Sequence, residues 1–139
     1  MIVLDTNVIS EALRAAPEPS VLKWLGNQPR ASVFTTAVTR GEILYGIRLL
    51  SDGKRRRGLW DAAQKIFSED FDGQVLSFDD DAADVYAEIA ASRRITGKPI
   101  SQFDAMIAAM ARSRGASLAT RNVKEFEACG VDVVNPWAA

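Results

Sequence analysis

Ile2-Val3-Leu4-Asp5-Thr6-Asn7 opens the chain with an apolar run that ends in a carboxylate. Three branched aliphatic residues in a row predict a short buried strand, and the polar residues after them predict a helix start capped by Thr6 or Asn7. Burying a lone carboxylate beside so much hydrocarbon is costly unless a partner compensates it. A shared cation explains Asp5, and for Asp5 taken alone a helix-capping role explains it about equally well.

A second carboxylate, Asp104, lies inside the most apolar helical stretch, Ile100 to Ala111. Its neighbours at three and four residues are Ile100, Ile107 and Ala108, so it shares a helix face with expected core residues. We expect Asp104 in mid-helix, where capping does not explain a carboxylate. Asp104 is therefore the stronger candidate for a ligand.

The residue types of the chain restrict the chemistry. There is no histidine and one cysteine, Cys129, which argues against zinc, copper or haem sites built from nitrogen and sulfur. It also excludes Ser-His-Asp and Cys-His catalysis. Oxygen ligands remain, and these suit Mg²⁺, Mn²⁺ or Ca²⁺.

Size and charge set further bounds. The chain has 139 residues, 47% of them hydrophobic, and we expect one domain over residues 1–139. Its formal net charge is −1, so any phosphate binding must be local. We find no pattern of a signal peptide or a membrane span. A lone cysteine is typical of a reducing compartment, and we expect a cytoplasmic protein.

Short β-like runs alternate with longer helical patterns, which predicts an α/β sandwich with a mostly parallel sheet. The predicted strands are residues 2–4, 33–35, 75–78, 117–120 and 131–134. The predicted helices are residues 8–13, 21–25 with Ser20 as the cap, 37–50, 54–71, one after Asp79-Asp80-Asp81 through about 90, and the Asp104 helix up to about 115.

Two polar residues follow strands of this predicted sheet. Asp5 follows the first strand and Asn122 follows the fourth. Ligands of parallel sheets bind outside the carboxyl ends of the strands, so we expect both residues at one rim. Asn122 taken alone is more typical of a turn.

Glu42 comes from the helix after the second strand. Its helical neighbours, such as Tyr45 and Leu49, are mostly apolar or small, so we expect it to face inward and to be half-buried. The spacing from Thr39 to Glu42 also fits a capping box, in which Glu42 would only bond back to a helix start. We expect Asp5, Glu42, Asp104 and Asn122 all to be half-buried near one rim, where they would make an oxygen cage whose repulsion a cation would relieve.

Four motif-like segments follow one another along the chain: Ile2-Val3-Leu4-Asp5-Thr6-Asn7, Thr39-Arg40-Gly41-Glu42-Ile43-Leu44-Tyr45-Gly46, Asp104-Ala105-Met106-Ile107-Ala108-Ala109 and Ala119-Thr120-Arg121-Asn122-Val123-Lys124-Glu125-Phe126. In this order they resemble the PIN domain, and the ending Asn135-Pro136-Trp137 is similar to its VapC and FitB type of bacterial toxin.

The resemblance implies a three-layer α/β/α sandwich around a five-stranded parallel sheet of order 3-2-1-4-5. It also implies a Mg²⁺- or Mn²⁺-dependent ribonuclease with Asp5, Glu42 and Asp104 at the metal. The fourth acidic position of the family falls on Asn122 here, where many relatives carry aspartate. An amide adds an oxygen but no charge, which weakens the case for a second tightly held metal.

The resemblance further implies hydrolysis of an RNA phosphodiester by metal-activated water, with tRNA or another structured RNA as target. The metal ligands would be supported by three polar side chains, Thr6, Asn7 and Thr120. Arg121, beside the expected site, suits the substrate phosphate. The densest basic patch is Lys54-Arg55-Arg56-Arg57, with Arg48 one helix earlier, and Arg48, Lys54 and Arg55 are further candidates for contact with RNA phosphates. For residues 54–57 a solvated helix start is the simpler interpretation.

Implied partners are a small antitoxin in the active-site groove, a second copy of the chain in a homodimer, and promoter DNA through the antitoxin complex. The main alternative is a weakly catalytic PIN scaffold that acts in that DNA-binding complex. A haloacid-dehalogenase-type phosphatase also opens with Asp-x-Asp, but Asn7 stands where its general acid would be. A receiver domain leaves Glu42 and Asp104 unexplained.

Overall fold

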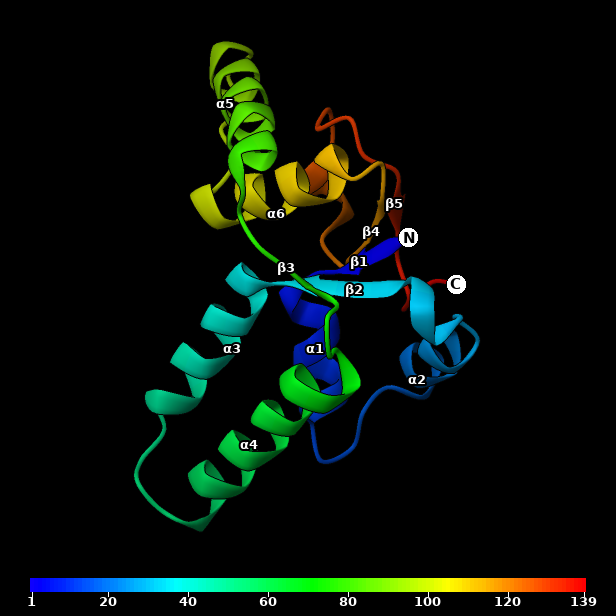
Figure 1. The fold of residues 1–139 in the computed structure, drawn as a ribbon, viewed down its shortest axis with the longest axis vertical. Coiled ribbons are helices and arrows are strands. Elements are labelled where there is room, and N and C mark those ends of the chain that lie inside the picture. Colours follow the sequence, from blue (N-terminus) through cyan, green and yellow to red (C-terminus); the bar gives the residue numbers. More distant parts are fainter.

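The structure, a computed structural model, describes residues 1–139. A parallel sheet of five strands runs through its middle in the order β3-β2-β1-β4-β5, which confirms the predicted order (Figure 1). The strands are β1 (Ile2–Leu4), β2 (Val33–Thr36), β3 (Val75–Leu76), β4 (Ser117–Ala119) and β5 (Val133–Val134).

Helices cover both faces of this sheet. In Figure 1, α5 and α6 lie on one side, and α1, α2, α3 and α4 lie on the other. The helices are α1 (Thr6–Leu13), α2 (Pro19–Gly26), α3 (Ala37–Arg48), α4 (Lys54–Lys65), α5 (Asp80–Ile95) and α6 (Gln102–Ser113). Short turns of other helix types are η1 (Arg30–Ser32), η2 (Ile66–Asp70) and η3 (Val123–Phe126). The predicted three-layer sandwich is confirmed.

The opening strand divides the hydrophobic core into two halves. Val3 belongs to the cluster that includes Ile107 and Met110 of α6, and Leu4 belongs to the cluster that includes Val8 of α1. Both strand residues are fully buried because successive side chains of a central parallel strand point to opposite covered faces. This explains why the first strand is apolar without alternation.

The strand order creates one crevice. From β1 the chain proceeds to β2 and β3 on one side, and then crosses to β4 and β5 on the other. The order reverses between β1 and β4, which pair in the register Leu4 to Ala119. Such a switch point leaves room for ligands outside the carboxyl ends of the two strands. Asp5 and Thr120 are the first residues beyond those ends.

Several predicted boundaries are wrong by a few residues. Glu18, not Ser20, stands at the cap position of α2, because Pro19 occupies the first helical position, where a missing N–H costs nothing. The predicted helix 54–71 changes to a π-helical turn after Lys65, and the last strand has two residues instead of four. No helix combines the length and hydrophobicity that crossing a membrane requires.

Candidate active site

Asp5 is buried at the carboxyl end of β1, with 3% of its surface exposed. Its N–H continues the sheet by donating to the carbonyl of Ala119 at 2.9 Å. Asp5 is also the N-cap of α1, since its Oδ1 accepts from the N–H of Thr6 at 2.8 Å. The expectation that Thr6 or Asn7 caps this helix is therefore wrong.

Thr120 and Asn7 hold the other oxygen of this carboxylate. The Thr120 hydroxyl donates to Asp5 Oδ2 at 2.7 Å, and Asn7 Nδ2 donates to the same oxygen at 3.2 Å. Thr120 Oγ1 in turn accepts from Asn7 Nδ2 and from the N–H of Asn122, both at 3.1 Å. Asn7 Oδ1 accepts from the N–H of Arg121 at 3.2 Å. This network joins the start of α1 to the loop after β4.

Burial raises the pKa of Asp5 from its ordinary 3.8 to about 6. The hydrogen bonds from Thr120 and Thr6 lower it, and the charges of Asp104 and Glu42 raise it. The carboxylate is thus ionised at neutral pH at an energetic cost. A positive charge placed beside it would relieve that cost.

Glu42 is half-buried and bonded to the start of α1. Its Oε1 accepts from the Thr6 hydroxyl at 2.7 Å, and Thr6 Oγ1 lies 3.1 Å from Thr39 Oγ1. The capping-box interpretation is wrong, because Thr36 caps α3 and Glu42 lies too far along the helix. The inward orientation was also inferred from neighbours that turn out to be exposed, Tyr45 at 66% and Leu49 at 68%.

Asp104 lies in the first turn of α6, so the expectation of a mid-helix position is wrong. Ser101 is the N-cap, and its hydroxyl accepts from the N–H of Asp104 at 3.2 Å. The residues that Asp104 faces along the helix, Ile107 and Ala108, are fully buried as predicted. Burial raises the pKa of Asp104, the Ser101 bond lowers it and the charge of Glu125 raises it.

One hollow of about 320 Å³ collects most of the predicted site. It is lined by Asp5, Thr6, Asn7, Ser10, Glu11, Glu42, Asp104, Arg121, Asn122 and Trp137. Thr120 lies behind Asp5, whereas Arg48, Lys54 and Arg55 are elsewhere. Asn122 is exposed and not half-buried as expected, because it follows the last residue tied to the sheet.

The sequence prediction missed three residues of this hollow, Ser10, Glu11 and Trp137. Ser10 and Glu11 stand three and four residues after Asn7, so helical spacing from the predicted site contained the signal. Trp137 is brought in by the chain after β5, and the Arg121 guanidinium carbon lies 5.2 Å from its ring centroid. No local pattern marks that contact.

Glu11 is buried and already satisfied by other groups. It accepts from the N–H of Glu18 at 3.0 Å and from Arg14 at 3.1 Å. The Glu18 bond is the main cause of its lowered pKa, with Arg14 and then Arg121 contributing. Glu11 therefore anchors the wall of the hollow and is the carboxylate least in need of a further cation.

Asp5, Glu42 and Asp104 offer carboxylate oxygens to the hollow, and Asn122 can add an amide oxygen. The donor set is oxygen only, which suits Mg²⁺ or Mn²⁺. The acids line one hollow but stand apart, and no three Asp, Glu, His or Cys side chains converge as a cage for a metal ion. A bound cation would have to draw them together or contact them through water.

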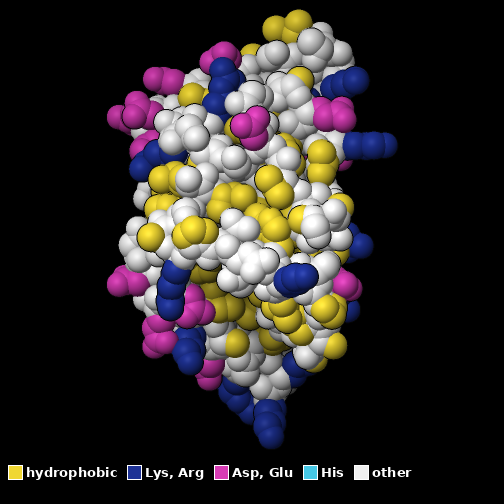
Figure 2. Space-filling view, turned by 90° about the vertical axis from the view of Figure 1, so that its right-hand side faces the viewer, with side chains coloured by type: hydrophobic (Ala, Val, Ile, Leu, Met, Phe, Trp, Pro, Cys, Tyr) yellow, Lys and Arg dark blue, Asp and Glu magenta, His cyan; other side chains and the backbone are white.

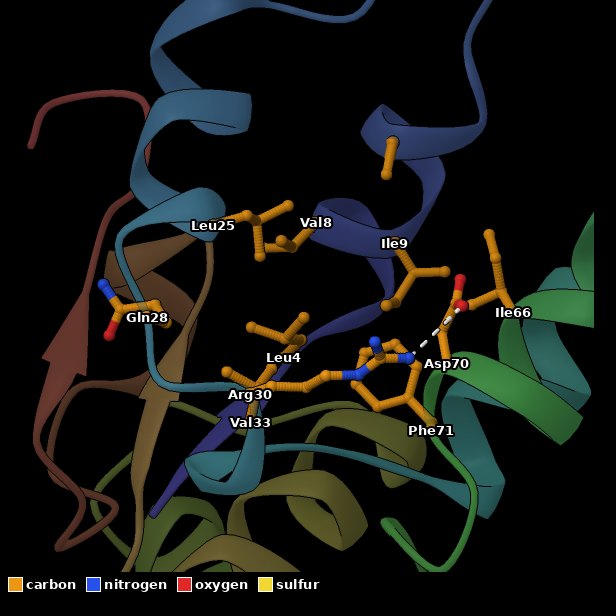
Figure 3. Close-up of a pocket in the computed structure, with 11 residues that line it drawn as sticks. Leu4, Val8, Ile9, Leu25, Gln28, Arg30, Val33, Ile66, Asp70 and Phe71 are labelled. Atoms are coloured by element: carbon orange, nitrogen blue, oxygen red, sulfur yellow. Dashed lines mark ion pairs between the residues drawn. The ribbon is translucent and has the colours of Figure 1, made fainter.

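A different, apolar hollow of about 370 Å³ lies between α1, α2 and the turn η2 (Figure 3). Its walls include Val8, Ile9 and Phe71, and the ion pair of Arg30 with Asp70, at 3.7 Å, lies at its side. The only carboxylate lining it is already paired. This hollow therefore offers no unpaired carboxylate to a cation, whereas the acidic hollow does.

Comparison with known proteins identifies the family of the chain. Residues 2–130 match the PIN domain family. The chain belongs to this family. It is 40% identical to the VapC ribonuclease Y4jK of Sinorhizobium fredii, over 99% of this chain and 98% of that one. It is 39% identical to the toxin FitB of Neisseria gonorrhoeae, over 99% of each chain.

A solved structure, FitAB bound to the IR36 DNA fragment, superposes with a TM-score of 0.92 at 39% identity, over 99% of this chain and 96% of that one. This PIN-domain protein is thus of the VapC and FitB toxin type. Membership in this family does not favour the three alternatives, which are the phosphatase, the receiver domain and the weakly catalytic PIN scaffold. In keeping with that, Asn7 is occupied in holding Asp5 and Thr120.

Proposed function

We propose that this chain is the metal-dependent endoribonuclease toxin of a type II toxin–antitoxin pair. The observation that carries the proposal is the burial of Asp5, whose pKa is raised to about 6 in a hollow shared with Glu42 and Asp104. The ribonuclease name of a relative 40% identical over nearly the whole chain supports it.

Asp5, Glu42 and Asp104 would hold a divalent cation, Mg²⁺ or Mn²⁺, and Asn122 would contribute a neutral oxygen. When bound, such a cation supplies a water of lowered pKa and offsets charge on the scissile phosphate. The donor chemistry fits this role because every candidate ligand is an oxygen and the burial of Asp5 favours a positive neighbour. Only one of the four positions lacks a charge.

The chain's own residues orient the reacting groups. Thr120, Asn7 and the Thr6 N–H fix both oxygens of Asp5. The Thr6 hydroxyl occupies Glu42 Oε1, which leaves Oε2 to take up a proton from the attacking water. Ordered supporting bonds of this kind hold a reactive carboxylate in one rotamer.

Arg121 would bind a substrate phosphate. Its guanidinium lies over the Trp137 ring at the edge of the acidic hollow, and no carboxylate forms an ion pair with it. A planar guanidinium suits phosphate oxygens through paired hydrogen bonds. The expected substrate is tRNA or another structured RNA, and the expected product carries a 5′ phosphate.

The proposed partners are those of the relatives. An antitoxin segment would occupy the acidic hollow, a second copy of the chain would complete a homodimer, and promoter DNA would bind through the antitoxin. The solved FitAB and VapBC complexes bound to DNA support the antitoxin and DNA parts of this proposal. The cytoplasm, where RNA and reduced thiols occur together, is the proposed location.

The test is cleavage of total RNA by purified protein with Mg²⁺, with Mn²⁺ and with chelator. We expect discrete products that disappear with chelator and in Asp104→Asn. The matched control is Asp84→Asn on the exposed surface of α5, which should cleave like the wild type. Cleavage that survives Asp104→Asn would remove the site assignment, and absence of cleavage with either metal would remove the proposed activity.

A further inference from the structure

The hairpin of α3 and α4 carries the strongest concentration of positive charge in the molecule. Residues 48–61 hold five of the 17 Lys and Arg and two of the 18 Asp and Glu, a charge of +3. Since the whole chain is −1, the remaining residues sum to −4. This hairpin ends at the lower tip of Figure 1, and Lys and Arg cover the same tip in Figure 2.

The tip holds a hollow of about 340 Å³ with an aromatic wall. The Arg48 guanidinium carbon lies 4.2 Å from the centroid of the Trp60 ring. The other lining residues are Asp52, Arg56, Arg57 and Asp61. A guanidinium stacked on an indole presents a flat surface, and the remaining arginines surround it with N–H donors.

Most of this charge is not neutralised within the protein. Asp52 is exposed and is shared by Arg56 at 4.0 Å and Arg57 at 3.7 Å, distances at the long end for an ion pair. Arg48, Lys54 and Arg55 form no ion pair at all. These exposed charges are therefore available to an external anion.

The tip is connected to the acidic hollow. Glu42 and Arg48 lie on the same helix six residues apart, a rise of about 9 Å. A third hollow, of about 340 Å³, shares Thr6, Ser10 and Glu42 with the acidic one and extends to Leu50 and Leu59 at the base of the tip. One extended ligand can therefore contact both ends.

We propose that the pocket formed by Arg48, Arg57 and Trp60 binds an unpaired nucleotide of the RNA substrate, a few nucleotides from the cleaved bond. The base stacks on the Arg48–Trp60 surface, and the arginines contact the flanking phosphates. RNA fits this pocket better than an acidic peptide does, because RNA offers both a base that can stack on the flat surface and phosphates that can bind the arginines. This inference rests on the proposed ribonuclease function.

Binding is tested separately from cleavage. The binding assay uses the Asp104→Asn protein with chelator present. This protein is titrated into a fluorescein-labelled RNA hairpin with an unpaired loop, at several KCl concentrations. We expect Arg48→Gln/Arg57→Gln to weaken binding at least fivefold and to reduce the salt slope by about 2. The matched control, Arg94→Gln/Lys98→Gln at the far end of α5, removes the same charge and should change binding less than twofold.

Stacking has its own signal in tryptophan fluorescence. We expect RNA to quench the tryptophan fluorescence of the Asp104→Asn protein. In the same background, the quench should be smaller in Trp60→Phe and unchanged in Trp24→Phe. In the active protein, the double arginine variant should raise KM with kcat unchanged. Thermal unfolding near the wild-type Tm confirms that each variant is folded.

The two proposals fail in different ways. Equal binding by the tip variant and its control, or a quench that Trp60→Phe leaves unchanged, overturns the nucleotide pocket whatever the cleavage assay shows. Absence of cleavage by the wild type with Mg²⁺ and Mn²⁺ overturns the ribonuclease, and the binding titration still decides whether the pocket takes RNA.

Discussion

The Thr120 hydroxyl donates a 2.7 Å hydrogen bond to Asp5 Oδ2 across a separation of 115 residues. The same hydroxyl oxygen accepts from Asn7 Nδ2 and from the N–H of Asn122. One buried oxygen thus joins the ends of β1 and β4 and orients the carboxylate. Five predictions follow from this network and from the acids around it.

Thr120→Val should lower the free energy of unfolding by about 1–3 kcal/mol, because it leaves buried groups without a partner. It should also raise the pKa of Asp5 further, since the Thr120 bond lowers that pKa. Chemical denaturation with chelator present measures the first effect. Thr120→Ser, which keeps the hydroxyl, is the control, and equal stability of the Val and Ser variants would contradict the prediction.

Asp5→Asn should reduce the loss of stability that the metal-free protein undergoes as pH rises, while abolishing activity. The folded pKa of Asp5 is about 6 against 3.8 ordinarily, so the folded state binds more protons between these values. Stability therefore falls as pH rises through this window, and the loss reaches up to about 3 kcal/mol above it. An amide does not titrate, so it removes this dependence on pH, although its nitrogen cannot accept the bonds that Thr120 and Asn7 donate to Oδ2. Thermal unfolding in chelator at several pH values checks this: the Tm of the wild type should fall as pH rises through the window by more than that of Asp5→Asn. Equal slopes for the two proteins would contradict the prediction.

Mg²⁺ binding should weaken on acidification. With a pKa of about 6, Asp5 is mostly protonated at pH 5 and mostly ionised at pH 7.5. A cation competes with that proton, so the affinity should fall about tenfold between pH 7.5 and pH 5. Calorimetric titration at the two pH values measures it. An affinity independent of pH would show that Asp5 is not a ligand.

Thr6→Val should reduce kcat about tenfold and weaken metal binding by a factor of 10 or more, because it releases Glu42 Oε1. Thr6→Ser keeps the hydroxyl and should restore both quantities. Chemical denaturation distinguishes positioning from simple destabilisation, since kcat should fall in Thr6→Val under conditions in which the variant remains fully folded. A Ser variant as impaired as the Val variant would exclude this role.

Asn122→Asp should tighten Mg²⁺ binding, because it adds a carboxylate to the hollow that holds Asp5, Glu42 and Asp104. In chelator the same variant should be slightly less stable through repulsion between the acids. Titration calorimetry measures the affinity, and Asn27→Asp at the end of α2, away from the hollow, serves as the control. Unchanged affinity would mean that residue 122 does not reach the cation.

Local patterns predicted most of the fold because they act over a few residues. The apolar run Ile2–Leu4 and the helical spacing in 37–50 identified the strand and the helix within two residues. Positions that depend on a helix start were less predictable. Asp104 was assigned to mid-helix, but Ser101 begins α6 only three residues before it. A Ser three residues ahead of an acid was the available signal.

Exposure was harder to predict than secondary structure. Glu42 was expected to face inward and to be half-buried, because its helical neighbours are mostly apolar or small. It is half-buried and held by Thr6, although two of those neighbours, Tyr45 and Leu49, are exposed. Asn122 was expected to be half-buried and is exposed. Apolar spacing marks a face of a helix, but which layer covers that face depends on the packing of distant segments.

The sequence by itself determined the succession of strands and helices along the chain and the oxygen-only set of candidate ligands. It also determined the presence of acids after the first strand and in the sixth helix. These follow from periodicity and residue type, which are local. Only the tertiary structure decided that Thr120 orients Asp5, that Thr6 holds Glu42, and that Glu11 and Trp137 border the same hollow. Such contacts arise because the parallel strand order brings chain ends from opposite halves of the sequence to one rim.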